Sequence, residues 1–259
     1  PHGLEGHQRV SQSLEGFTQQ CRKIVDDHGG SLIYAGGDDV LALLPLHTAF
    51  QCSRALHDTF FDTLKGCFEG PLLKDCPTLS VGMAICHHLQ PMGEMRELAK
   101  QAEKMAKVER NSLGVVFKKR GGSSIELAEM WSHKHQGRSF NDRIWYWADL
   151  FKQNVIPHAT AFMLSDAIAP LTVQWNELSM EEQHSVSNAC QSLAAGVVDR
   201  RDITGDVEVV QAHQAMLKSY FQTADNPVLQ IQRLSVELQI AREMTTVIKE
   251  SWGIEGEQA

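Results

Sequence analysis

Residues 31–44 read SLIYAGGDDVLALL, with an apolar run on each side of the tetrad Gly36-Gly37-Asp38-Asp39. Apolar runs around a Gly-Gly pair predict a tight β-hairpin, because glycine tolerates the positive φ angles that such a turn requires. The two aspartates would then stand side by side at the tip of a buried hairpin. Carboxylates are rarely buried without a partner. Asp38 and Asp39 are therefore predicted to bind a divalent metal of the kind used in phosphoryl chemistry. The alternative is a turn whose acids are simply solvated.

The residues around the hairpin alternate between helical and extended patterns. Apolar side chains recur at helical spacing in three stretches, residues 10–24, 50–64 and 94–110, and buried strands are predicted at residues 79–85 and 115–117. The resulting order is helix, strand, strand, helix, strand, helix, strand. It matches a ferredoxin-like or palm arrangement that lacks its first strand.

The second half of the chain has a different pattern. After Gly121-Gly122 the sequence reads as helical throughout, with a capping box at Ser179-x-x-Glu182 and a helix start at Asn226-Pro227. We therefore place a boundary near residue 122. The predicted fold class is α+β, with a palm domain over residues 1–122 followed by an all-α C-terminal domain over residues 123–259.

Composition narrows the classes of function. Residues 1–122 hold 14 Lys/Arg and 14 Asp/Glu, whereas residues 123–259 hold 10 and 18, so the net charge of 10 − 18 = −8 lies in the second part. An acidic surface binds nucleic acid poorly by itself and favours docking to proteins. No apolar run is long enough to span a membrane. The six cysteines form no C-x-x-C pair, which argues against zinc and favours a reducing, cytoplasmic location.

Two further positions are candidates for contact with a nucleotide. Lys107 lies in the last turn of the predicted third helix, where a lysine could reach a triphosphate as a mobile point charge. Its alternative is a solvated lysine face supported by a Glu103–Lys107 pair. Ser80 and Gly82 lie on the predicted strand after the hairpin and either face the nucleotide or allow close packing.

Three segments together resemble the large, polymerase-like subunit of type III CRISPR effector complexes. The most specific is residues 33–45, IYAGGDDVLALLP; residues 79–85, LSVGMAI, and 106–112, AKVERNS, are shared with nucleotide cyclases generally. The helical second part also fits the C-terminal domain of that family. The chain has no initiator Met and no signal-peptide pattern, so we expect it to be part of a longer protein.

The resemblance implies a palm that binds ATP and Mg²⁺ (or Mn²⁺) and makes cyclic oligoadenylates, messengers for antiviral defence, when the complex holds target RNA. Asp38 and Asp39 would bind the metal and orient the attacking 3′-hydroxyl, which displaces pyrophosphate from an α-phosphate. Gly36 and Gly37 would let the backbone approach the phosphates, and Lys107 would steady the triphosphate. The implied partners are the other subunits, guide RNA, target RNA and an N-terminal part of the large subunit.

One departure from the family affects the metal site. The family's palm begins with a strand that bears another carboxylate, and no such strand precedes Val10 here. We therefore expect a carboxylate from outside residues 1–259 to complete the metal site, or the isolated chain to be catalytically silent.

Two alternative functions remain open. One is a diguanylate-cyclase-like enzyme, against which Val40 directly after Asp39 argues. The other is a non-enzymatic assembly module whose acidic helical tail docks small helical subunits.

Overall fold

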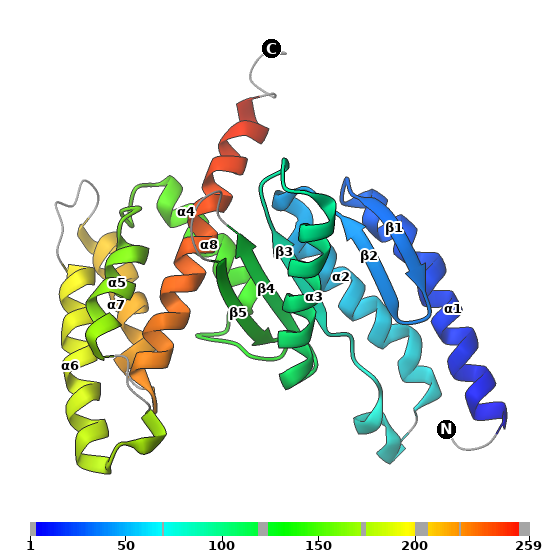
Figure 1. The fold of residues 1–259 in the computed structure, drawn as a ribbon, viewed down its shortest axis with the longest axis horizontal. Coiled ribbons are helices and arrows are strands. Elements are labelled where there is room, and N and C mark those ends of the chain that lie inside the picture. The colour runs from blue at the N-terminus through cyan, green and yellow to red at the C-terminus, as the bar shows by residue number, and fades with distance from the viewer. Residues whose placement is uncertain are drawn as a thin grey trace. The chain divides into compact units, whose positions relative to one another are not determined.

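The computed structural model describes residues 4–68, 70–118, 124–171, 175–199, 207–222 and 224–253. The chain divides into two compact units, Pro1–His133 and Lys134–Ala259. Within the described residues, the first unit holds all the strands and the second is built from helices (Figure 1). No helix in this described part is long and apolar enough to cross a lipid bilayer.

The first unit follows the predicted order of elements and extends it by one strand. In chain order its elements are α1 (Leu4–Asp27), β1 (Ser31–Gly36), β2 (Asp39–Leu43), α2 (Leu46–Leu64), β3 (Val81–Ile85), α3 (Met92–Glu109), β4 (Ser112–Lys118) and β5 (Ser124–Met130). The strands form two sheets, one with the order β1-β2 and one with the order β3-β4-β5. We call α1, β1, β2 and α2 the hairpin half, and β3, α3, β4 and β5 the sheet half.

Strand β5 corrects the expectation that the chain is helical throughout after residue 122. It pairs antiparallel with the whole of β4, from Ser112 opposite Met130 to Lys118 opposite Ser124. The predicted boundary near residue 122 lies outside the described residues, and the first unit continues to His133. The physical reason is that β4 is buried along nearly its whole length, so its backbone groups need a partner on both edges.

The hairpin half is held together by an apolar core between α1 and α2. Helix α1 buries Phe17, Cys21 and Val25, which recur every four residues on one face. Phe17 meets Phe60 of α2 edge to face, with ring centroids 5.1 Å apart. One face of the hairpin closes this core through Leu32, Ala35, Val40 and Ala42. The amphipathic helices and the alternating strand pattern thus account for how the hairpin is supported.

The opposite face of the hairpin is open, which corrects the expectation of a buried hairpin. Ile33 and Tyr34 on β1 are 56% and 55% exposed, and Leu41 and Leu43 on β2 are 37% and 39% exposed. Successive side chains of a strand point to opposite faces, and a register shift between Leu32 and Tyr34 interrupts this alternation, so that Ile33 and Tyr34 are both exposed. The apolar runs therefore supply both the covered face and an exposed apolar face, which the sequence pattern alone does not distinguish.

The sheet half is packed unusually closely at two glycines. β3 and β4 are parallel, and their register places Gly82 directly beside Gly114. A Cβ atom on Gly82 would lie 2.3 Å from the backbone nitrogen of Glu103, and one on Gly114 would lie 2.1 Å from the carbonyl oxygen of Ala102. Helix α3 therefore rests with its backbone directly against the strands. Close packing, the alternative reading of Gly82, is correct.

The second unit is helical over its described residues. Its helices are α4 (Phe140–Lys152), α5 (Thr160–Ile168), α6 (Met180–Asp199), α7 (Val207–Gln222) and α8 (Pro227–Gly253). Helix α8 packs against the other four. Arg143 of α4 forms a bidentate ion pair with Glu237 of α8, with N–O distances of 2.7 and 3.1 Å, and both side chains are buried.

Local signals in the second unit match the predicted helix starts. The capping box at Ser179 and Glu182 is formed, with Ser179 N–H donating to Glu182 Oε2 at 2.8 Å. Asn226 Oδ1 accepts a hydrogen bond from Leu229 N–H at 3.1 Å, directly at the start of α8. These contacts satisfy backbone donors that the helix itself leaves unpaired.

Candidate active site at the hairpin tip

The four residues of the tetrad form the end of the hairpin. Gly36 at the end of β1 pairs with Asp39 at the start of β2, so Gly37 and Asp38 are the two turn residues. Gly37 has φ +65°, a backbone angle that favours glycine, and is the first central residue of the turn. Thr18 of α1 donates a hydrogen bond to the Gly37 carbonyl oxygen at 3.4 Å. The turn is therefore tied to the helix beneath it.

Replacement of Gly37 by alanine tests this turn geometry. We expect Gly37→Ala to lower the free energy of unfolding by about 1–2 kcal/mol, because a Cβ atom disfavours the left-handed region. Gly37→Asn should cost much less, since asparagine tolerates that region. Chemical denaturation of both variants measures the difference. Equal stability of the alanine and asparagine variants would contradict a turn that needs positive φ.

Gly36 is constrained by its neighbour rather than by its backbone angle. A Cβ atom on Gly36 would lie 2.5 Å from the hydroxyl oxygen of Tyr34. The half-exposed tyrosine ring therefore lies against the glycine on the open face of the hairpin. Thr18 and Tyr34 were not predicted to take part, because their contacts with the tip depend on side-chain placement that no motif signals.

The two carboxylates at the tip are accessible. Asp38 and Asp39 are both exposed, so the argument that burial demands a partner does not hold for them. Adjacent exposed carboxylates still suit Mg²⁺, which prefers oxygen ligands and completes its shell with waters and substrate phosphates. Within the described ranges no group of three or more His, Cys, Asp and Glu side chains gathers in a metal-binding arrangement. The tip thus offers two oxygen-bearing side chains.

Lys107 lies within the electrostatic field of the tip. Its Nζ is 2.5 Å from Glu103 Oε1, and the lysine side chain is 62% exposed. The hydrogen bond to Glu103 raises the pKa of Lys107 above its usual value, against an opposing effect of burial. The negative charges of Asp39 and Asp38 add to this rise. The charges of Asp38 and Asp39, at the hairpin tip, therefore act on Lys107, in the last turn of α3.

Ser80 is the remaining residue predicted to contact a nucleotide. It lies directly before β3, in the sheet half, and is half-buried. Its predicted contact with a nucleotide stays a prediction.

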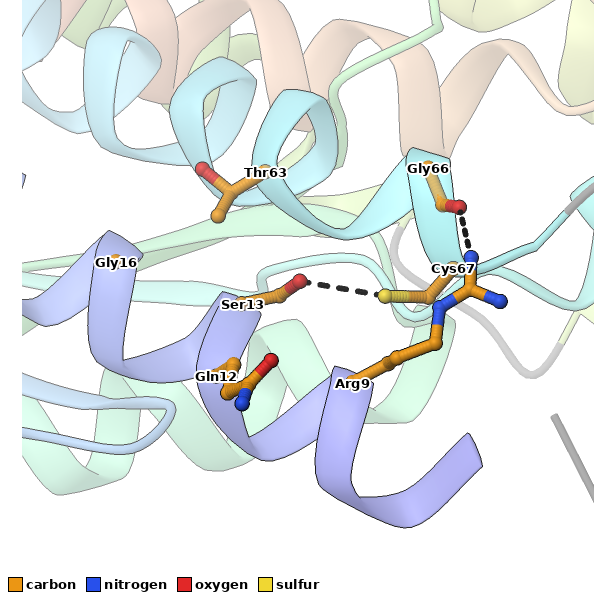
Figure 2. Close-up of a pocket in the computed structure, with 7 residues that line it drawn as sticks. All are labelled: Arg9, Gln12, Ser13, Gly16, Thr63, Gly66 and Cys67. Carbon is orange, nitrogen blue, oxygen red and sulfur yellow. Dashed lines mark hydrogen bonds between the residues drawn. The ribbon is translucent and has the colours of Figure 1, made fainter. Parts of the chain in front are cut away.

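A shallow pocket on the hairpin half contains none of the predicted site residues. It has a volume of about 470 Å³ and is lined by Arg9, Gln12, Ser13, Gly16, Thr63, Gly66 and Cys67 (Figure 2). Arg9 donates to the Gly66 carbonyl oxygen at 3.1 Å, and Ser13 Oγ lies 3.2 Å from Cys67 Sγ. The lining holds no carboxylate that could bind a metal. The hairpin tip is exposed to solvent, but it has two carboxylates that can bind a metal, so it is the better candidate site for phosphoryl transfer.

The fold and this tip define an α+β palm domain followed by a helical region. Residues 2–114 match the family described as Cas10/Cmr2, second palm domain. This part of the chain is therefore similar to the second palm domain of Cas10/Cmr2, and the match supports a palm portion of a type III CRISPR large subunit.

A comparison with curated proteins agrees. The chain is 37% identical over 95 residues to the CRISPR system Cmr subunit Cmr2 of Pyrococcus furiosus. The matched segment covers 36% of this chain, and the chain spans about a tenth of that relative's length.

Proposed function

We propose that this chain is part of the large subunit of a type III CRISPR effector complex and that its hairpin tip makes cyclic oligoadenylates from ATP. The observation that carries the proposal is the placement of two exposed carboxylates, Asp38 and Asp39, within the field of a cation, Lys107. Such a pairing suits a metal-bound triphosphate. The match to a Cas10/Cmr2 palm supports the same reaction class.

Each residue of the tip has a distinct part in the proposed reaction. Asp38 and Asp39 would hold Mg²⁺, which supplies charge neutralisation at the phosphates when bound. Gly37, which has no side chain within the turn, leaves the backbone open to the triphosphate. Lys107 binds the negative charge of the phosphates as a mobile cation. Together these residues position the α-phosphate for attack by a 3′-hydroxyl, with pyrophosphate as the leaving group.

A strand from outside residues 1–259 would complete the site. β2 has only β1 as a described partner, and β3 has only β4, so each is an edge strand. Edge strands present unpaired backbone groups that accept a further strand. An added strand beside β2 would bring its side chains close to Asp39, the first residue of β2. We propose that it carries the additional carboxylate.

The direct test uses the complete effector assembly. Incubation with ATP, Mg²⁺ and target RNA should yield cyclic oligoadenylates, whereas the 259-residue chain alone should yield none. Chromatography of the products with mass spectrometry identifies the cyclic oligomers. An assembly that cleaves or binds target RNA but makes no oligoadenylate would overturn the proposed activity.

Removal of the Lys107 charge gives a graded test. We expect Lys107→Ala to raise the KM for ATP about tenfold, the equivalent of about 1.4 kcal/mol of lost phosphate binding. The fold should be unaffected, because an exposed ion pair contributes little to stability. Lys100→Ala is the matched control, since Lys100 is an exposed lysine of the same helix with its own glutamate partner, Glu97. An equal change in KM for both variants would remove Lys107 from the site.

A further inference from the structure

The described strands of the palm domain form two separate sheets, one in each half. The hairpin half carries Asp38 and Asp39, and the sheet half carries Lys107. Among the described strands no backbone ladder connects β2 to β3. Apolar contacts do join the halves, since Leu79, just before β3, packs against the core of the hairpin half. Such contacts are non-directional, so something else must fix the relative placement of the carboxylates and the lysine.

A polar network centred on His57 crosses between the halves. His57 of α2 is only 8% exposed, and both of its ring nitrogens have partners. Nδ1 lies 2.8 Å from Asp58 Oδ1, and Nε2 lies 2.6 Å from Asn111 Oδ1. Both oxygens are acceptors, so the ring makes both hydrogen bonds as an imidazolium, with an N–H donated from each nitrogen. Asn111 belongs to the turn between α3 and β4, so one buried imidazole connects α2 to the sheet half.

The network has a second crossing at Trp131, the residue after β5. The rings of His57 and Trp131 pack with centroids 4.9 Å apart. Arg54 donates to the Trp131 carbonyl oxygen at 3.3 Å and to Asp58 Oδ2 at 2.9 Å. The backbone N–H of Trp131 donates to the Asn111 carbonyl oxygen at 2.9 Å. Asn111 is therefore held by its side chain from α2 and by its backbone from the end of β5.

The charges in the network keep it assembled. Burial raises the pKa of Asp58, but hydrogen bonds from Arg54 and His57 outweigh this effect, and the net pKa lies below its usual value. Asp58 is thus ionised at neutral pH and accepts from both residues. A carboxylate that accepts from the Nδ1–H of a histidine fixes the ring orientation, which aims Nε2 at Asn111.

The turn that this network holds has an unfavourable backbone conformation. Arg110 and Asn111 have φ of 56° and 45°, in the left-handed region that non-glycine residues seldom occupy. Helix α3 ends at Glu109, just before this turn, and Lys107 lies in its last turn. Contacts that stabilise the turn therefore also fix where the end of α3 lies.

We propose that His57 is a positioning residue: through Asn111 it fixes the end of α3, and so sets the placement of Lys107 relative to Asp38 and Asp39. The role of Lys107 rests on the proposed function, whereas the contacts of His57 do not. His57 touches neither carboxylate of the tip and acts only through the turn.

Two substitutions at Asn111 separate the effect of losing its hydrogen bond with His57 from the effect of its positive φ angle. Asn111→Gly removes the side chain but tolerates φ 45°, and Asn111→Asp keeps an oxygen acceptor and also tolerates that angle. We expect Asn111→Gly to raise the amide hydrogen-exchange rates of residues 111–113 about tenfold and to raise the KM for ATP of the assembled complex severalfold. Asn111→Asp should leave the exchange rates and the KM for ATP within twofold of their values in the unsubstituted protein. Equal effects of the two substitutions would overturn the proposal.

A second variant separates the network from the added flexibility of a glycine. His57→Phe keeps a ring against Trp131 but removes both ring nitrogens, and we expect it to raise the exchange rates of residues 111–113 about tenfold. If Nε2 acts through Asn111, the double variant His57→Phe/Asn111→Gly should exchange no faster than His57→Phe alone, within twofold. If the glycine acts by flexibility alone, the increases in exchange rate of the two single variants should multiply, to about a hundredfold in the double variant. That result would contradict the proposal.

The two readouts keep this inference distinct from the proposed function. An assembly that makes no oligoadenylate overturns the proposed function, while the exchange rates still decide whether His57 holds the turn. Faster exchange in Asn111→Gly with an unchanged KM in an active assembly would overturn the positioning of Lys107.

Discussion

Replacement of both tip carboxylates, Asp38→Asn with Asp39→Asn, should reduce oligoadenylate synthesis by the assembled complex about a thousandfold or more. A metal held by these groups contributes several kcal/mol of charge stabilisation in the transition state. About 4 kcal/mol corresponds to a thousandfold change in rate. Synthesis is measured in the complete assembly with ATP, Mg²⁺ and target RNA.

The same variant should fold normally. Both aspartates are exposed, and surface substitutions of this kind change the free energy of unfolding by about 0.5 kcal/mol or less. Asp27→Asn is a matched control, because Asp27 is also an exposed carboxylate of the hairpin half and pairs with Lys23 on α1. Retained synthesis in the double variant, or an equal loss in Asp27→Asn, would show that the tip is not the catalytic site.

Addition of a single methyl group at Gly114 should destabilise the palm domain by about 3 kcal/mol or more. In Gly114→Ala the new Cβ atom would lie 2.1 Å from the carbonyl oxygen of Ala102, which belongs to the backbone of α3 and has no side-chain freedom to move away. Overpacking of a well-packed site typically costs about 1–3 kcal/mol, and here α3 as a whole must shift. Denaturant unfolding followed by circular dichroism measures the loss.

A glycine within α3 itself provides the control. Gly93 has no atom within 4 Å of the position of an added Cβ, and it lies in the first turn of the helix. Gly93→Ala should therefore stabilise the protein by about 0.4–1 kcal/mol, because alanine restricts the unfolded chain. If Gly114→Ala unfolds at the same denaturant concentration as the parent protein, α3 does not rest on β4 as described.

The local elements of the palm domain could be predicted from the sequence. The helix α1 follows from apolar residues such as Phe17, Cys21 and Val25 on one face, and the hairpin follows from two apolar runs around Gly37. Both signals depend on residues a few positions apart, so the chain pattern contains them. Strand β5 was missed because its short sequence SIELAEM carries two glutamates, one of which, Glu129, is buried in the fold.

The environment of the candidate site could be predicted only in part. Asp38, Asp39 and Lys107 were chosen as candidates from their motifs, but the prediction of a buried hairpin around the two aspartates was wrong. Exposure depends on which face of the hairpin receives the α1–α2 core. The alternation of residues in a strand defines two faces without stating which one is covered.

The sequence of this chain, taken alone, determined its local structure and its family resemblance, because both reside in contiguous segments such as residues 33–45. The distances within the site came from the three-dimensional fold. Helix α3 can lie on the strands only because Gly82 and Gly114 become neighbours, and His57 meets Asn111 across 54 positions of the chain. The GGDD tip and Lys107 are likewise far apart in sequence, and only the tertiary fold brings their charges into one field.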